Sequence, residues 1–318
     1  MKKISIMIPC YNEEENIIEI GDAVEEVIKN QLPQYDYEIC YVDNASTDRT
    51  RELIEEVCAT NKKRKAIFNV TNFGQFNSPF HGICELDGDC VISVCADFQD
   101  PVEMIPIFVH EWEKGHRIVS GVKTSSKESG LIYFMRSVYY KMIKKMSSVH
   151  IIEHFTGFGL YDKSFVKLMR GLDDPLPFIR GVVAEYGEGF NLKLIEYEQP
   201  IRRAGKTHNN FFTLYDAAML SFTSYTKAGL RIMTMIGFIV GFIDILVAIV
   251  YFVLKLIHWY DFNAGYAPMI IGMFLIGAMQ MVFMGFIGEY IMNINIRTIH
   301  RPIVVEERRI NFDEKKDY

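Results

Sequence analysis

Apolar strand-like runs alternate with segments of helical periodicity through the N-terminal part of this chain. The strand-like runs lie at residues 4–9, 37–42, 66–70, 90–96 and 117–121, and the helix-like segments at 17–28, 53–58 and 102–114. This alternation is typical of βαβ units, in which helices cover both faces of a mainly parallel sheet. We therefore expect an α/β fold with ligands bound at the carboxyl ends of its strands.

Polar turns follow four of these strands. They occupy residues 10–14, 44–48, 72–77 and 97–101. Taken singly, each is more typical of a turn or a helix cap than of a functional site. Because parallel strands end at one edge of a sheet, the four turns together indicate a binding site at that edge.

Several function classes are disfavoured by the sequence. No G-x-G-x-x-G follows the first strand and no G-x-x-x-x-G-K-[ST] is present, which argues against dinucleotide enzymes and P-loop NTPases. A formal charge of −6 gives no basic footprint for nucleic acid. Without a glycine-rich cradle, a bound diphosphate needs another source of positive charge. A divalent ion held by Asp97 would supply it, and hard oxygen ligands favour Mg²⁺ or Mn²⁺.

Two long apolar stretches mark the C-terminal third, at residues 232–254 and 266–294. Each exceeds the ~20 residues that a membrane-spanning helix needs. Lys227 and Arg231 precede the first stretch, and further basic residues follow the second. The positive-inside rule therefore predicts a two-helix transmembrane hairpin in the inner (plasma) membrane, multi-pass, with the catalytic domain and both termini cytoplasmic. Two buried helices of a soluble core are the alternative.

The remaining segments complete a predicted domain plan. Residues 209–231 are amphipathic, which suits a membrane surface or an ordinary packed helix. The six cysteines lack disulfide or zinc spacing, so a reducing compartment is expected. The plan is a cytoplasmic transferase-type domain over 1–208, a juxtamembrane segment over 209–231, the two spans within 232–294 and a cytoplasmic tail over 295–318.

Three motifs carry a family resemblance. MIPCYNEE at 7–14, VDNASTD at 42–48 and ADFQDP at 96–101 resemble the motifs of family 2 inverting glycosyltransferases, which have the GT-A nucleotide-diphospho-sugar transferase fold. The polyprenyl-phosphate branch, with dolichol-phosphate mannose synthases and bactoprenol glucosyltransferases, is the more similar one. PIRRAGK at 200–206 resembles its R-x-x-G segment, and residues 288–290 and 301–302 resemble the end of its second membrane helix. The resemblance covers nearly the whole chain in the right order.

This resemblance implies a hexosyltransferase. Such an enzyme moves a hexose-type sugar from a UDP- or GDP-sugar to an undecaprenyl- or dolichyl-type polyprenyl phosphate, with inversion, at the cytoplasmic membrane face. It also implies contact with membrane lipid and a homo-oligomer. A phosphate acceptor is already anionic at neutral pH, so the enzyme needs positioning and charge neutralisation more than a strong base.

The resemblance also assigns residues. Those implied to bind the nucleoside are Pro9, Tyr11, Glu13 and Asp43. Asp97 and Gln99 would place Mg²⁺ or Mn²⁺ on the donor diphosphate. The residues implied to receive the acceptor phosphate are Arg202, Arg136 and Lys206, and arginine suits this role because it pairs bidentately with phosphate. A loop at 156–162 would shape the sugar and acceptor side.

Two departures from the family pattern leave alternatives open. The loop at 156–162 lacks the acid that many relatives carry nearer its start, which leaves the identity of any catalytic base open. Cys95 stands where the family usually has an acid, and a thiol is a poor ligand for a hard cation. Either Asp97 holds the metal with Gln99 and the diphosphate, or metal use is weaker. A catalytically impaired membrane-anchored nucleotide-sugar-binding or scaffold protein is thus one alternative function. Another polysaccharide-synthesising glycosyltransferase is a second, although neither Trp112 nor Trp259 lies in a Q-x-x-R-W context.

Overall fold

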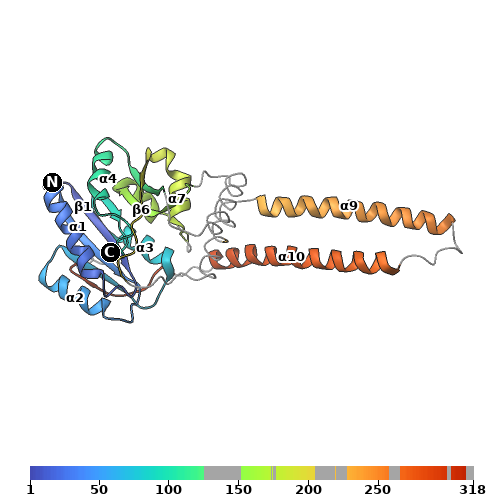
Figure 1. Ribbon diagram of the computed structural model, residues 1–318, viewed down its shortest axis with the longest axis horizontal. Helices are drawn as coiled ribbons and strands as arrows, with labels where there is room; N and C mark the ends of the chain where they lie inside the picture. Colours follow the sequence, from blue (N-terminus) through green and yellow to red (C-terminus); the bar gives the residue numbers. More distant parts are fainter. Residues whose placement is uncertain are drawn as a thin grey trace. The chain divides into compact units, whose positions relative to one another are not determined.

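The computed structural model of the 318-residue chain describes residues 1–124, 152–172, 174, 177–204, 219, 228–257, 266–298 and 302–312. The chain divides into two compact units (Figure 1). One unit contains a β-sheet with its helices. The other contains two long helices, α9 (Ala228–Ile257) and α10 (Tyr266–Thr298).

The sheet has eight strands in the order β7-β5-β6-β4-β1-β2-β3-β8. Their bounds are β1 Lys3–Cys10, β2 Asp36–Asp43, β3 Arg64–Asn69, β4 Cys90–Ser93, β5 Ile118–Lys123, β6 Phe155–Asp162, β7 Leu192–Tyr197 and β8 Glu306–Ile310. The pairs β4-β1, β1-β2, β2-β3 and β5-β7 are parallel, and the pairs that involve β6 or β8 are antiparallel. The predicted α/β fold of GT-A type is thus confirmed, with a mixed, mostly parallel sheet.

Alternating side chains of the central strand β1 pack into two separate apolar clusters, one on each face of the sheet. Ile4, Ile6 and Ile8 belong to one apolar cluster and Met7 to the other, as the two-residue period of a strand requires. The first cluster includes residues of α1 (Ile17–Gln31), α2 (Thr50–Thr60) and α4 (Met104–Glu113). The second includes residues of α3 (Gly74–Glu85), α6 (Lys163–Arg170) and α7 (Ile179–Tyr186), the last followed by the 3-10 turn η1 (Glu188–Phe190). Helices therefore cover both faces, as predicted.

The segment 156–162, predicted as a loop, lies in a strand. It forms most of β6, which pairs antiparallel with both β4 and β5. The loop was implied by the family resemblance, and the structure gives Gly159 within this strand a packing role. A Cβ atom added there would lie 2.5 Å from the carbonyl oxygen of Val119 on β5. The glycine permits close strand approach instead of marking a turn.

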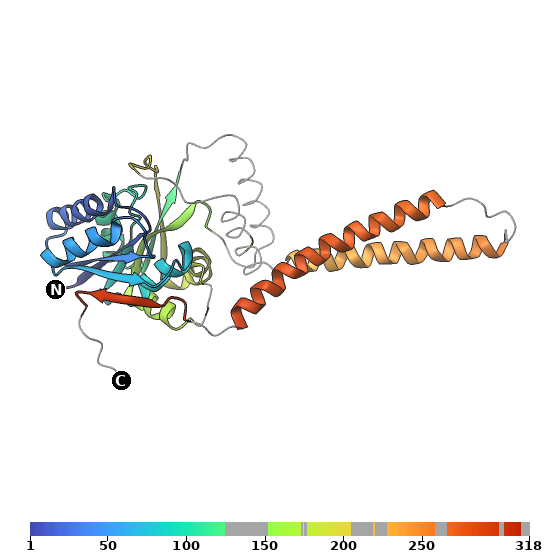
Figure 2. The ribbon, with the colours of Figure 1, turned by 90° about the horizontal axis from the view of Figure 1, so that it is seen from below.

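The C-terminal strand β8 was not anticipated from the sequence. It follows α10 along the chain and pairs antiparallel with β3, so β8 is the edge strand on that side of the sheet (Figure 2). Its sequence EERRI has little apolar character, and a charged edge strand of this kind is protected against pairing with other chains. The segment predicted as a plain tail therefore contributes to the sheet.

The expected membrane hairpin is not supported. Within the described ranges, no helix combines the length and the apolar character needed to cross a bilayer. The multi-pass localisation in the inner membrane, with catalytic domain and termini cytoplasmic, is therefore wrong as predicted. That prediction rested on the apolar composition and length of residues 232–254 and 266–294, which fall within α9 and α10.

Candidate functional site

The four polar turns lie at one edge of the sheet, as expected. β4, β1, β2 and β3 are neighbours and run parallel, so their carboxyl ends share that edge. The chain order changes direction between β1 and β4, because β2 and β3 lie on one side of β1 and β4 on the other. Such a switch point is where open α/β sheets bind ligands. Glu13 follows β1 and Asp97 follows β4, on either side of it.

Three of these turns contain a non-glycine residue in the left-handed region. The φ angles are 56° at Asn12, 63° at Ala45 and 59° at Phe98. These residues follow β1, β2 and β4 within a few positions of the strand end. Left-handed backbone is costly for residues other than glycine, and it concentrates at functional sites. The three sharp turns thus mark the same edge as the sequence motifs do.

The turns after β1 and β2 are joined by hydrogen bonds. The backbone N–H of Asn12 donates to Ser46 Oγ over 2.9 Å, and the N–H of Thr47 donates to Asn12 Oδ1 over 2.8 Å. The N–H of Glu13 donates to Thr50 Oγ1 over 2.8 Å. Side chains of one turn therefore satisfy the backbone of the other, and the two turns form one rigid unit.

Asp43, at the end of β2, is fully buried. Both of its carboxylate oxygens accept from the backbone N–H of Ser46 at 3.3 Å, and Oδ2 lies 3.0 Å from Arg51 Nε. Burial raises the pKa of the Asp43 carboxyl, while Ser46 and the Arg51 guanidinium oppose that rise. The residue expected to hold the nucleoside thus also holds its own turn in shape.

Arg202 lies between two of the predicted site carboxylates. Its Nη2 donates to Glu13 Oε1 over 2.5 Å, and its Nη1 lies 3.6 Å from Asp97 Oδ2. Burial raises the pKa of Glu13 and so does nearby Asp97, whereas Asn16 and Arg202 lower it. The structure therefore brings Glu13, Asp97 and Arg202 together, with one positive charge facing two carboxylates.

The segment 201–204 forms hydrogen bonds to the chain after β1 and to the turn after β4. The side-chain amide of Asn16 donates to the Ala204 carbonyl at 3.3 Å and to Glu13 Oε2 at 2.8 Å. The Arg203 N–H donates to the Asp97 carbonyl at 3.4 Å. The Arg203 guanidinium lies 4.9 Å from the Phe98 ring centroid. Asn16 was not predicted as a site residue, although its position three residues after Glu13 could have indicated it.

The turn that carries Asp97 also carries Gln99, and both residues have oxygen atoms that can bind a divalent cation. Asp97 Oδ1 accepts from the Gln99 N–H over 3.1 Å, so the two residues share one tight turn. Carboxylate and amide oxygens are hard ligands that suit Mg²⁺ or Mn²⁺. The described part of the chain holds no group of three or more His, Cys, Asp or Glu able to bind a metal. Asp97 and Gln99 thus fit a cation that takes its other ligands from a diphosphate.

Cys95 is not suited to that role. Desolvation, together with nearby Asp100 and Asp97, raises the pKa of the Cys95 thiol well above the usual value, although solvent reaches the residue. It is therefore neutral at physiological pH. The Cys95 N–H donates to Asp100 Oδ2 over 3.1 Å, and Tyr197 Oη donates to Asp100 Oδ1 over 3.1 Å. Asp100 was not predicted as a site residue, and it supports the turn that carries Asp97.

The other predicted site residues are only partly described. Pro9 pairs with Val42 within the sheet, and Tyr11 follows β1 at the same edge, half-buried. Arg136 and Lys206 lie outside the described residues, as does most of the amphipathic segment 209–231. Their predicted roles at the acceptor phosphate stay predictions.

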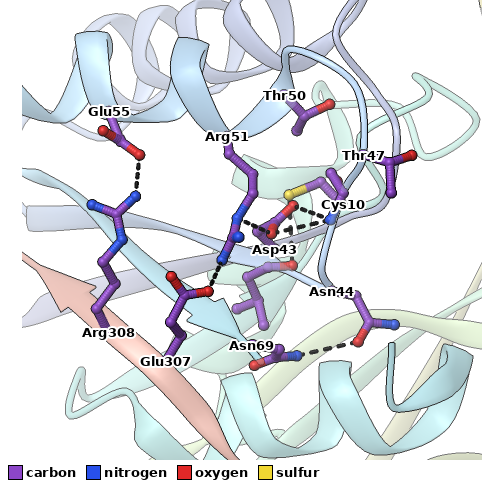
Figure 3. Close-up of polar contacts among 12 residues, drawn as sticks. Cys10, Asp43, Asn44, Thr47, Thr50, Arg51, Glu55, Asn69, Glu307 and Arg308 are labelled. Carbon is purple, nitrogen blue, oxygen red and sulfur yellow. Dashed lines mark hydrogen bonds and ion pairs between the residues drawn. The ribbon is translucent and has the colours of Figure 1, made fainter. Parts of the chain in front are cut away.

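Asparagines connect the turn after β3 to that after β2. Asn44 Nδ2 donates to Asn72 Oδ1 over 2.8 Å, and its Oδ1 accepts from the Phe73 N–H over 2.9 Å. Asn69 Nδ2 also donates to Asn44 Oδ1, over 3.2 Å (Figure 3). The sequence placed Asn72 beside a strand end but gave no sign of this network.

The sequence matches a family model and is similar to known proteins. A family model described as Glycosyl transferase family 2 matches residues 5–169. The uncharacterized glycosyltransferase YkoT of Bacillus subtilis (strain 168) is 31% identical over 308 residues, which cover 94% of this chain and 89% of YkoT. The bactoprenol glucosyl transferase of Shigella phage SfV is 28% identical over 94% of this chain and 96% of its own length.

A solved structure is also similar. Glucosyl-3-phosphoglycerate synthase from Mycobacterium tuberculosis, in complex with Mn²⁺, UDP-glucose and phosphoglyceric acid, is 15% identical with a TM-score of 0.48. That similarity covers 70% of this chain and 78% of the synthase chain. The family model and the relatives define the class of protein, which is a glycosyltransferase. The chain belongs to glycosyl transferase family 2.

Proposed function

We propose that this glycosyltransferase moves a hexose, with glucose the first candidate, from a nucleotide-diphospho-sugar to a polyprenyl phosphate. The near full-length similarity to proteins named bactoprenol glucosyl transferase supports this acceptor and sugar. The contact of Arg202 with Asp97 at the switch point carries the proposal. In this contact the Arg202 guanidinium, which we propose binds the acceptor phosphate, lies beside the Asp97 carboxylate, which we propose acts at the donor diphosphate.

The reaction follows from the charges. A nonbridging oxygen of the acceptor phosphate attacks the anomeric carbon of the donor sugar. The bond from that carbon to the donor β-phosphate oxygen breaks, and the nucleoside diphosphate leaves with its electron pair. One displacement inverts the anomeric configuration. No proton has to be removed from the nucleophile, so a strong general base is not needed.

The protein's part is positioning and charge neutralisation. Glu13, Asp43 and the two joined turns would hold the nucleoside, and the diphosphate would lie towards Asp97. A Mg²⁺ or Mn²⁺ ion held by Asp97 and Gln99 would offset the charge on the leaving diphosphate. Arg202 would attract the incoming phosphate and shield it from the site carboxylates.

A transfer assay tests the proposal. Purified full-length protein is incubated with undecaprenyl phosphate and a panel of radiolabelled UDP- and GDP-sugars, with Mn²⁺, with Mg²⁺ or with EDTA. We expect label in the organic phase only when both polyprenyl phosphate and a divalent ion are present. Donor binding without transfer of any sugar would contradict the proposal and favour a catalytically impaired nucleotide-sugar-binding protein.

A further inference from the structure

Arg51 connects the edge strand β8 to the candidate donor site, because it contacts both Glu307 and Asp43. Arg51, in the first turn of α2, has Nε 3.0 Å from Asp43 Oδ2 and Nη2 2.6 Å from Glu307 Oε2 (Figure 3). Asp43 terminates β2, and Glu307 belongs to β8. Two carboxylates from opposite ends of the chain thus share one guanidinium.

A bulge directs the Glu307 side chain. Phe68 pairs with Arg308 and Asn69 pairs with Glu306, so Glu307 is the extra residue between these two pairs. A bulge of this kind changes the direction of a side chain at a sheet edge and often occurs beside functional sites. Here it accompanies the contact between Glu307 and Arg51.

The Asp43–Arg51 contact matters because Asp43 is fully buried. A buried carboxylate without a cation nearby is costly. The contact between Arg51 Nε and Asp43 lacks hydrogen-bond alignment, so charge attraction and packing hold it. The Arg51 guanidinium also lies 5.1 Å from the Phe68 ring centroid. Glu307 therefore supplies the directional contact that orients Arg51.

Asp43 transmits this orientation to the donor edge. Its carboxylate accepts from the Ser46 N–H, and Ser46 Oγ accepts from the Asn12 N–H. Both turns carry left-handed residues, Ala45 and Asn12. A shift of Asp43 would therefore move the paired turns together.

We propose that Glu307 is a positioning residue for the nucleoside diphosphate site, acting through Arg51 on Asp43 and the turn at 44–48. This inference rests on the proposed function for the identity of the ligand. It assigns a role in donor binding to the C-terminal strand, which lies beyond the residues matched by the family model.

The chain offers a matched control. Arg308 of β8 forms an ion pair with Glu55 of α2, so it joins the same two elements without touching Asp43. The side chains of Glu307 and Glu55 are 45% and 42% exposed. Glu307→Gln and Glu55→Gln thus remove equivalent charges from parallel contacts, and only the first lies on the path to Asp43.

Three measurements on the full-length protein test the proposal. The first is the Kd for UDP and for GDP in the presence of Mn²⁺. We expect Glu307→Gln to raise it about fivefold or more, as a coupling between sites would, and Glu55→Gln to leave it within about twofold, because the Glu55–Arg308 pair does not contact Asp43. The second is the same Kd in an Arg51→Gln background. There Glu307→Gln should not change the Kd further, because Glu307 acts through Arg51.

The third measurement needs no ligand. Hydrogen exchange at the Ser46 and Thr47 amides should be faster in Glu307→Gln than in Glu55→Gln, at equal thermal stability. Unchanged exchange at these amides would overturn the inference, whatever nucleotide binds. If the wild type binds neither UDP nor GDP but the exchange result holds, the proposed ligand is wrong and the positioning role stands. Equal nucleotide affinities for both variants overturn the role in binding.

Discussion

Arg202 Nη2 donates to Glu13 Oε1 over 2.5 Å, although the two residues are 189 positions apart in the sequence. Glu13 lies in the turn after β1, and Arg202 follows β7, the far edge strand of the sheet. The contact closes the segment 201–204 over the switch point. A bound donor or acceptor phosphate would therefore compete with Glu13 and Asp97 for the positive charge of Arg202.

Replacing Arg202 separates acceptor chemistry from donor binding. Arg202→Ala should lower the rate of transfer to polyprenyl phosphate by on the order of 100-fold, because a positioned charge at the reacting phosphate is lost. The Kd for the nucleotide should change by less than about fivefold. Rates and nucleotide affinities of Arg202→Ala and of Arg203→Ala, an exposed neighbour, provide the comparison. Equal loss of donor binding in Arg202→Ala would contradict the assignment to the acceptor.

Asp97 is predicted to couple the donor to the divalent ion. Asp97→Asn should reduce transfer by on the order of 100-fold, since a neutral amide is a weaker ligand for a hard cation. The concentration of Mn²⁺ that gives half-maximal rate should rise as well. A Mn²⁺ titration of the transfer rate measures both effects. An unchanged Mn²⁺ requirement would remove Asp97 from the metal site.

Gly159 should tolerate no side chain. A Cβ there would lie 2.5 Å from a backbone oxygen of β5, so Gly159→Ala should lower the free energy of unfolding by about 2 kcal/mol or more. Gly189 has no atom within 4 Å of the equivalent position, and Gly189→Ala serves as the control. Urea denaturation measures both. Equal stability of the two variants would argue against the close pairing of β5 with β6.

Glu25 is predicted to make stability depend on acid pH. Burial would raise its pKa, but hydrogen bonds from Lys29, Arg64 and Tyr37 lower it from 4.5 to about 2. The folded state therefore binds fewer protons than the unfolded state between these values. The stabilisation is complete above pH 4.5 and is lost as the pH falls towards 2.

The variant Glu25→Gln isolates this effect. At pH 7 it should cost about 2 kcal/mol, because charged hydrogen bonds within the buried cluster are weakened. The difference from wild type should shrink steadily as the pH falls below 4.5. Unfolding free energies from urea titrations over this range test the dependence. A difference that does not vary with pH would rule out the lowered pKa.

The sequence predicted the parts of the fold that depend on local pattern. Ile4, Ile6 and Ile8 alternate in β1, and Ile17, Ile20 and Val24 recur at helical spacing in α1, so these elements could be placed from periodicity alone. The common edge of Glu13 and Asp97 followed from the parallel arrangement. The contact of Arg202 with both could not be derived by periodicity, because it joins distant segments.

Elements that depend on tertiary context were missed. The strand β8 has no apolar alternation and forms because β3 offers an unpaired edge. The helix α3 contains Pro79 and begins within a segment that looked like a polar turn. The segment 156–162 was expected as a loop from the family resemblance, whereas it forms most of β6, where Gly159 lies against the backbone of β5. The membrane expectation rested on the length and apolar composition of 232–254 and 266–294, and no described helix has the properties that a span requires.

The stoichiometry of nucleotide release tests the central claim most directly. Purified protein, one sugar donor from the panel, Mn²⁺ and undecaprenyl phosphate are mixed, and released nucleotide and lipid-linked sugar are both quantified. The proposed displacement predicts one nucleoside diphosphate for each sugar in the lipid fraction, and release that depends on polyprenyl phosphate. Release of nucleoside monophosphate, or of diphosphate at the same rate without the acceptor, would contradict transfer of the sugar to a lipid phosphate.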